Sequence, residues 1–161
     1  MTTRPARKED APAVAALVTQ LGYDAVPEEV AERLARLLMK SDHRFIVAEA
    51  DGRLLGWVHV ELSESVDSDT FALIAGLVVD RSHRRQGVGA ALMAEAEAWA
   101  RQHGCAMVRL RSSSTRPPAH RFYEGLGYAN VKTQYSFVKP LDPRGAEMAR
   151  RLVPRVEPDA T

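Results

Sequence analysis

The sequence predicts a single-domain α/β (α+β) fold, in which about four helices flank a twisted, mostly antiparallel mixed sheet of about six to seven strands. The chain has 161 residues, the size of one domain. Two strand-like runs, residues 45–50 and 54–62, flank Asp51-Gly52, a dipeptide typical of a tight antiparallel hairpin. Strand, helix and strand patterns follow one another over residues 71–111, which predicts a right-handed parallel crossover.

The N-terminal elements are predicted from apolar spacing and from helix end signals. A short strand is expected over residues 2–7, followed by a helix over residues 9–21 that ends at Gly22. A second helix begins at Pro27 with two glutamates, a start that suits the positive end of the helix dipole. Two helices therefore precede the main part of the sheet.

The middle of the chain carries the strongest patterns. Residues 63–70 have little apolar content, and we expect an exposed loop there. Residues 71–79 are the most hydrophobic run, so we place this strand at the centre of the sheet. An amphipathic helix over residues 87–103 ends at Gly104, and a strand over residues 105–111 follows.

The C-terminal part is predicted to complete the sheet. A short helix is expected from Pro117, followed by a hairpin-like pair near residues 128–132 and 135–139. We place the domain in residues 1–140 and a C-terminal tail, which we expect to fray, in residues 141–161.

Composition excludes several classes of protein. The 22 basic and 21 acidic residues give a net charge of +1, without the excess of positive charge typical of nucleic-acid binding. The longest apolar runs fall far short of the roughly 18 residues that cross a membrane. Cys105 is the single cysteine, and the five histidines lack zinc-ligand spacing. We therefore expect a cytoplasmic protein with no metal, no nucleic-acid partner and no membrane partner.

The charges are unevenly distributed. Residues 49–70 contain six acids and one base, whereas residues 80–128 contain eight arginines and four acids. One interpretation is that both segments are solvated faces, as most charge runs are. The other is that a cationic ligand lies near the first segment and an anionic ligand near the second.

The junction between the central strand and the following helix carries the clearest chemical signal. Gly87 and Gly89 let the backbone approach a bulky anion at the start of a helix, where amide groups point outward. Arg84 and Arg85 add charges suited to phosphate oxygens. The pattern favours a pyrophosphate site. The alternative is that the two glycines only form the turn that begins the helix. The Walker loop, the dinucleotide fingerprint and the serine-hydrolase elbow are absent from the sequence.

Two motifs together resemble the GNAT superfamily of acyl-CoA-dependent N-acyltransferases. The first is the strand Leu77-Val78-Val79-Asp80 that leads into Arg84-Arg85-Gln86-Gly87-Val88-Gly89. The second is the helix and turn Ala119-His120-Arg121-Phe122-Tyr123-Glu124-Gly125-Leu126-Gly127-Tyr128. The resemblance runs from the first strand to about Lys139. It implies direct transfer of an acetyl group from acetyl-CoA to a primary amine, with no covalent enzyme intermediate.

The resemblance also implies roles for individual residues. Backbone groups of Leu77 and Val79 would bind the pantetheine arm, and the amide of Leu77 would face the thioester oxygen. Tyr123 would protonate the departing thiolate, although a packed aromatic ring is the alternative. The implied set of cofactor-binding residues is Leu77, Val78, Val79, Arg84, Arg85, Gln86, Gly87, Val88, Gly89, Ala90 and Arg116.

The sequence departs from the family at two positions. Arg116 stands where an asparagine often contacts the cofactor, and Leu73 stands where many members have a glutamate base. The proton acceptor is therefore open. The candidates, with the first slightly favoured, are Glu61, Glu64, Asp67, Asp69 and His59.

The acceptor and the partners are open as well. The acidic segment suggests a small cationic amine, and a homodimer would be common in the family. The rival functions are a non-catalytic acyl-CoA-binding or regulatory module, and an acetyltransferase of protein N-termini or lysines.

Overall fold

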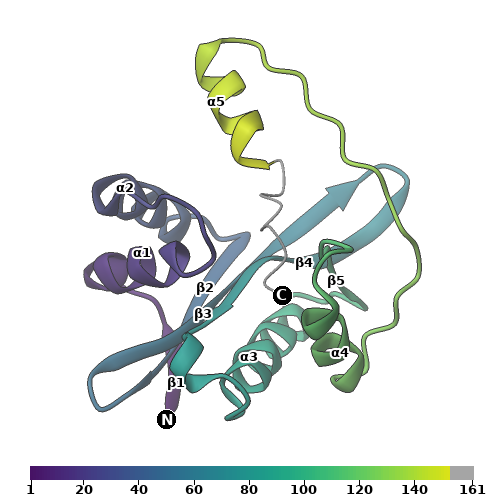
Figure 1. The fold of residues 1–161 in the computed structure, drawn as a ribbon. Coiled ribbons are helices and arrows are strands. Elements are labelled where there is room, and N and C mark those ends of the chain that lie inside the picture. The colour runs from purple at the N-terminus through teal and green to yellow at the C-terminus, as the bar shows by residue number, and fades with distance from the viewer. Residues whose placement is uncertain (153–161) are drawn as a thin grey trace, which may run out of the picture. The chain divides into compact units, whose positions relative to one another are not determined.

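The computed structural model of the chain describes residues 1–152 (Figure 1). The chain divides into two compact units, Met1–His120 and Arg121–Thr161, and each is described by itself. The elements in chain order are β1 (Thr2–Pro5), the 3-10 helix η1 (Lys8–Asp10), α1 (Ala11–Thr19), α2 (Pro27–Leu38), β2 (His43–Ala50), β3 (Arg53–Ser65), β4 (Ser68–Val79), the 3-10 helix η2 (Arg81–His83), α3 (Val88–Gln102), β5 (Val108–Leu110), α4 (Pro117–Gly125) and α5 (Pro143–Leu152).

Five strands form one mixed sheet in the order β1-β2-β3-β4-β5. The first four are antiparallel to their neighbours, and β5 runs parallel to β4 after the crossover through α3. The hairpin between β2 and β3 turns at Asp51 and Gly52, which both have a positive φ, of 50° and 73°. The mostly antiparallel α/β fold expected from the sequence is confirmed.

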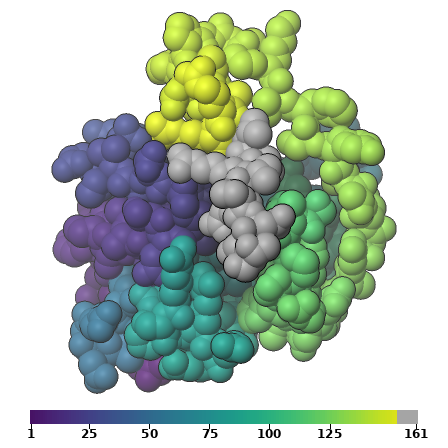
Figure 2. Space-filling model, in the orientation of Figure 1, coloured from purple at the N-terminus to yellow at the C-terminus, as the bar shows by residue number. Residues whose placement is uncertain are grey.

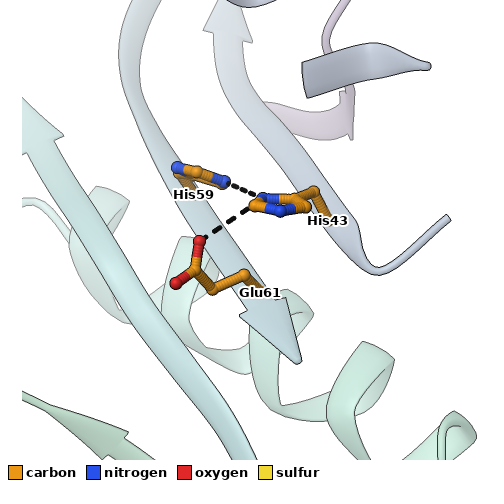
Figure 3. Close-up of side chains that lie close together, drawn as sticks. All are labelled: His43, His59 and Glu61. Carbon is orange, nitrogen blue, oxygen red and sulfur yellow. Dashed lines mark hydrogen bonds and ion pairs between the residues drawn. The ribbon is translucent and has the colours of Figure 1, made fainter. Parts of the chain in front are cut away.

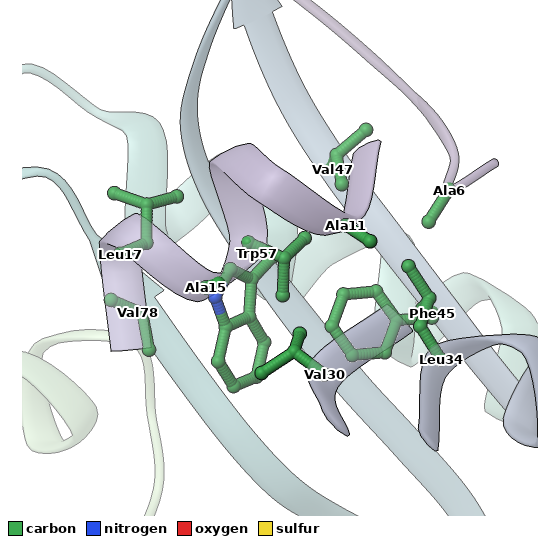
Figure 4. Packing of buried hydrophobic residues seen from close by; sticks show 11 residues of the cluster. Ala6, Ala11, Ala15, Leu17, Val30, Leu34, Phe45, Val47, Trp57 and Val78 are labelled. Atoms are coloured by element: carbon green, nitrogen blue, oxygen red, sulfur yellow. The ribbon is translucent and has the colours of Figure 1, made fainter. Parts of the chain in front are cut away.

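The two faces of the sheet are covered by different helices. Helices α1 and α2 pack on one face, and α3 packs on the other (Figure 1). Figure 2 shows the side chains of α1 and α2 in contact at the surface. Beneath them, Phe45, Val47 and Trp57 from the sheet meet Leu17 of α1 and Leu34 of α2 in a buried apolar cluster (Figure 4). This cluster fixes both helices on the sheet.

The segment expected to be a loop over residues 63–70 is instead mostly strand. β3 continues to Ser65 and β4 begins at Ser68, so that a long hairpin projects with only a tight turn between them. The expected exposure of residues 64–70 is correct. Polar side chains do not prevent strand formation here, because the backbones of β3 and β4 hydrogen-bond to each other whichever side chains they carry.

The second unit contains the end of α4 and all of α5. The strands expected near residues 128–132 and 135–139 are not formed, and residues 129–140 have no helix or strand. Their apolar side chains are exposed, as at Tyr135 and Phe137. A hairpin without a sheet or helix behind it is marginal, which accounts for the difference. Part of the predicted tail is helical as α5, and residues 153–161 lie outside the described residues.

None of the helices within residues 1–152 is long and apolar enough to cross a membrane.

Candidate active site

The central strand β4 has two halves with different surroundings. It pairs with β3 from end to end, but β5 pairs only with Ala72–Ile74. Within residues 1–152, no strand hydrogen-bonds to the other edge of residues 75–79. The C-terminal half of β4 therefore has one open edge.

A bulge at Ala75 decides which amide groups face this open edge. His59 pairs with Gly76 and Val60 pairs with Ile74, so Ala75 has no opposite residue. Before the bulge, the Ala72 amide donates toward β5, to the Met107 carbonyl at 3.1 Å. After it, the Asp80 amide donates toward β3, to the Leu55 carbonyl at 2.8 Å.

Successive backbone amides of a strand point in opposite directions, so the direction of one fixes the next. The amide of Asp80 points toward β3. The amides of Val79 and Leu77 therefore point to the open edge. An extended ligand with alternating carbonyl and amide groups could pair with β4 there as an added strand does.

The close approach of another side chain constrains β4 at Gly76. A Cβ atom at this position would lie 2.8 Å from Cζ3 of Trp57, whose indole ring packs over the strand. Glycine is therefore required next to Leu77, and the Trp57 ring holds that part of β4 in place.

The loop after β4 is fixed by the carboxylate of Asp80. This group accepts hydrogen bonds from the Ser82 hydroxyl and the Ser82 amide and, at 3.1 Å, from the side-chain amide of Gln20 on the other side of the loop. These bonds, with the Ser82 hydroxyl as the largest cause, hold the pKa of Asp80 well below its usual range. The carboxylate therefore stays charged and keeps the loop ordered.

The first turn of α3 presents backbone donors without helical partners. Gly87, with a φ of 82°, makes the turn into the helix, and Ala91 donates the first bond of the helix to its carbonyl at 3.0 Å. The amides of residues 88–90 have no acceptor carbonyl within the helix, because the residues one turn earlier precede it. No side chain caps this end of the helix. An anion is stabilised at such a helix start by these amides and by the helix dipole.

The side chains of the predicted cofactor set have different environments. Arg84 and Arg85 are exposed, and Gln86 donates to the Ser82 carbonyl of its own loop. Val78 is buried in the core, which leaves only its backbone for a ligand. Arg116 is exposed just before α4.

Tyr123 lies on α4, within the second unit. Its ring is half-buried and meets Phe122 and Tyr128 edge to face, with centroid distances of 5.1 and 6.1 Å. The turn after α4 returns the Tyr128 amide to the Tyr123 carbonyl at 3.0 Å, with Gly127 at a φ of 91°. Both the catalytic interpretation of Tyr123 and its packing in an aromatic cluster agree with this geometry.

Three titratable side chains meet on the sheet face that α1 and α2 cover (Figure 3). His43 lies opposite Glu61, and Phe45 lies opposite His59, so His43, His59 and Glu61 share one face. Nδ1 of His43 is 2.9 Å from Nε2 of His59 and 3.4 Å from Oε2 of Glu61. The His59 ring also stacks on Phe45, with centroids 5.7 Å apart.

The environment of this cluster keeps His59 neutral. Burial lowers the pKa of His59 to about 4, and the positive charges of His43 and Lys40 add to the effect. The side chain of His43 is 13% exposed and that of Glu61 is 30% exposed, so the cluster is reachable from solvent. The neutral ring keeps a lone pair on one nitrogen and can accept a hydrogen bond, but at neutral pH it binds a proton only transiently.

The structure thus brings together only some of the proton-acceptor candidates. Glu61 and His59 are neighbours, whereas Glu64, Asp67 and Asp69 are exposed toward the tip of the β3–β4 hairpin. Asp67 is engaged with Ser65 across the tight turn.

No sequence motif marks His43, the third residue of this cluster, as a site residue. Its place opposite Glu61 depends on the register of β2 against β3, which shifts by one residue at Ala48 and Glu49. The turn at Asp51-Gly52 is the one sequence feature that indicates the register between these two strands. Without the shift, however, it would have placed His43 opposite Val60 and on the other face from Glu61.

Comparison with known proteins identifies the family. A family model described as "Acetyltransferase (GNAT) family" matches residues 12–128. Aminoglycoside N(6')-acetyltransferase type 1 from Stenotrophomonas maltophilia is 29% identical over 147 residues, covering 88% of this chain and 95% of that protein. The enzyme of the same name from Klebsiella aerogenes is 32% identical over 116 residues, covering 70% and 76%.

A solved structure has the same fold. The apo aminoglycoside antibiotic 6'-N-acetyltransferase from Acinetobacter haemolyticus superposes with a TM-score of 0.77 at 21% identity, covering 88% of this chain and all of that one. Fold and relatives together define the class of the protein as an N-acetyltransferase of mixed α/β architecture. Because the family model matches well over half of its length, the chain belongs to the acetyltransferase (GNAT) family, as the sequence motifs indicated, and its donor is an acyl-CoA.

Proposed function

We propose that this protein transfers the acetyl group of acetyl-CoA directly to a primary amine of a small polycationic molecule. The observation that carries the proposal is the continuity of backbone donors, from the open edge of β4 at Leu77 and Val79 to the uncapped start of α3 at residues 88–90. A CoA thioester has the matching groups, because its pantetheine arm carries amides and its far end carries a pyrophosphate. The two sets of backbone donors thus match the two parts of one ligand.

Each part of the donor site has a distinct task. The amides of residues 88–90 bind the pyrophosphate, and Arg84 and Arg85 add positive charge beside it. The amide of Leu77 faces the thioester oxygen, where negative charge grows as the amine attacks. One such donor stabilises the transition state by about 3 kcal/mol. Arg116 is a further phosphate contact in this proposal.

The acceptor amine must lose a proton before it attacks, because most of it is protonated at neutral pH. Glu61 is the final acceptor of this proton. His43 contacts both His59 and Glu61, so the two histidines can relay the proton from the amine to Glu61. Tyr123 protonates the departing thiolate of CoA. For Tyr123, replacement by phenylalanine with no change in turnover would remove it as the acid.

The charge of the β3–β4 hairpin supports a polycationic acceptor. Glu61, Glu64, Asp67 and Asp69 give this hairpin a strongly negative surface. Two relatives carry names that specify aminoglycosides. Another relative is the aminoalkylphosphonate N-acetyltransferase of Salmonella typhimurium, 31% identical over 144 residues. The anionic phosphonate of that substrate class would be repelled by the acidic hairpin, so we favour the aminoglycoside class.

We place the reaction in the cytoplasm. Cys105 is the single cysteine of the sequence and is a free, buried thiol, which suits a reducing compartment. A homodimer stays a prediction.

Measuring CoA release over a panel of amines tests the function. The panel should contain aminoglycosides, polyamines, aminoalkylphosphonates, and peptides with free N-termini or lysines. We expect turnover with the polycations. Acetyl-CoA binding without turnover on any amine would instead favour a non-catalytic acyl-CoA-binding module.

The donor site is tested by thermal stabilisation with acetyl-CoA. Gly89→Trp fills the start of α3, and we expect it to abolish the stabilisation. Ala94→Trp controls for the added ring, because Ala94 lies further along the same helix; it is exposed, whereas Gly89 is buried, so melting temperatures are compared for both variants. Unchanged stabilisation of Gly89→Trp would contradict the proposed site, provided that its melting temperature without ligand shows a folded protein.

A further inference from the structure

We propose that His43, His59 and Glu61 form a binding site for one divalent transition-metal ion of the zinc class. The site lies on the sheet face that α1 and α2 cover (Figure 3). It is separate from the donor site, which is made by the open edge of β4 and the start of α3.

The spacing of the ligand atoms fits such an ion. One ligand atom from each side chain lies within 4.8 Å of the other two. At zinc–ligand distances of roughly 2.0–2.1 Å, the atoms around a tetrahedral zinc ion are about 3.3 Å apart. The two distances from Nδ1 of His43, 2.9 Å to Nε2 of His59 and 3.4 Å to Oε2 of Glu61, bracket this value. The ligand atoms of His59 and Glu61 lie within 4.8 Å of each other, and rotation of these two side chains would bring both to the ion.

The protonation of the cluster also fits. A hydrogen bond now joins the two rings, so one ring nitrogen carries the proton between them. Binding of the ion at both nitrogens would displace this proton to solvent.

Groups around the three ligands orient and tune the site. The carboxylate of Asp42 lies 3.7 Å from Nε2 of His43, the ring nitrogen that would face away from the ion. The negative charge of this carboxylate would stabilise a bound cation. Lys40 is also near, and its charge opposes a bound cation. Ions that form strong bonds to imidazole, such as zinc, nickel and copper, are therefore favoured over magnesium and calcium.

Three protein ligands leave a fourth position open, as in metal sites that bind water or substrate. The ligands stand on two hydrogen-bonded strands, β2 and β3, so their positions are fixed by the sheet. One consequence rests on the proposed function: a bound ion would occupy the lone pairs that accept the proton of the amine. Metal and proton would then compete, and the ion would inhibit acetyl transfer.

The experiment titrates zinc into untagged, chelator-treated protein by calorimetry, in the absence of acetyl-CoA and amine. Cobalt serves as a second probe, because its absorption spectrum reports tetrahedral coordination. We expect one ion per chain with micromolar affinity. His43→Gln and His59→Gln should each weaken binding at least tenfold, whereas His103→Gln should not, since His103 bonds to the Trp99 carbonyl at the far end of α3.

Binding that is absent at millimolar zinc, or equally strong in His59→Gln and His43→Gln, would overturn the proposal. Circular dichroism of each variant shows whether it is folded. If one variant is unfolded, zinc binding by the other variant and the cobalt spectrum of the wild type test the site. The outcome is independent of the proposed function, because acetyl transfer is measured separately by CoA release in the presence of a chelator.

Discussion

The two sides of the proposed active site are built from different parts of the polypeptide. The donor side uses backbone amides of neighbouring residues, at Leu77, Val79 and the start of α3. The acceptor side uses the side chains of His43, His59 and Glu61, which two strands bring together. Substituting a side chain leaves a backbone amide in place but removes an imidazole or carboxylate. The donor side should therefore tolerate most substitutions other than proline or bulky residues, while the acceptor side should tolerate few.

The largest effect is expected for Leu77→Pro. Proline removes the amide that, in our proposal, faces the thioester oxygen, and this amide is not used in pairing with β3. We expect kcat to fall by roughly 10²–10³-fold, as for the loss of one donor to a developing oxyanion. Leu77→Ala keeps the amide and should stay within a few fold of wild type. The measurement is CoA release at saturating acetyl-CoA, with melting temperatures as the check on folding.

An equal fall in kcat in Leu77→Pro and Leu77→Ala would mean that the Leu77 side chain, and not its amide, is needed for turnover. The donor side would then depend on side chains, as the acceptor side does.

The next effect is expected for Glu61→Gln. The amide cannot accept the proton of the amine, so we expect kcat/KM to fall by about 10²-fold, near the lower end for general acid–base catalysis. The loss should shrink as the pH rises, because more of the amine is then already deprotonated. Glu64→Gln is the control, since Glu64 is exposed and lies three residues after Glu61. If both variants lose activity equally and without pH dependence, the hairpin acts only by its overall charge.

The difference between the two sides also explains what could be predicted from the sequence. The donor side follows from consecutive residues: a hydrophobic strand, arginines, and Gly87 and Gly89 at a helix start. These signals predict the end of β4 and both ends of α3 to within one residue, whereas β4 begins three residues earlier than predicted. The open edge depends on the bulge at Ala75, and no residue pattern marks that bulge.

The acceptor side depends on pairing between distant segments. Glu61 and His59 were candidates because of their residue types. Their partner His43 lay just outside the predicted strand, and a bulge in the β2–β3 pairing sets its face. For the same reason, the polar composition of residues 63–70 predicts a loop, whereas hydrogen bonds between β3 and β4 override this local preference.

A smaller effect, on stability, is expected at His59. Because its folded pKa of about 4 lies below the ordinary value of 6.5, the unfolded chain binds a proton between these values and the folded chain does not. Stability therefore falls as the pH is lowered from 6.5 toward 4. In His59→Gln we expect this loss to be smaller by about 1 kcal/mol between pH 7 and pH 5. Urea unfolding at both pH values, with a chelator present, measures the difference.

An identical pH dependence in wild type and His59→Gln would show that the His59 ring takes up its proton in the folded state, and so is poorly shielded from solvent.

The smallest effect is expected for the exposed arginines of the donor side. Arg84→Ala or Arg85→Ala removes one solvated charge near the proposed pyrophosphate site, and such charges contribute roughly 0.5 kcal/mol each. We expect the Kd for acetyl-CoA to rise about two- to threefold, with a smaller rise at high salt because the charges are screened. Arg101→Ala, at the other end of α3, should leave the Kd unchanged. A loss above tenfold in either variant would place most of the binding energy in side chains, and the donor side would then be built like the acceptor side.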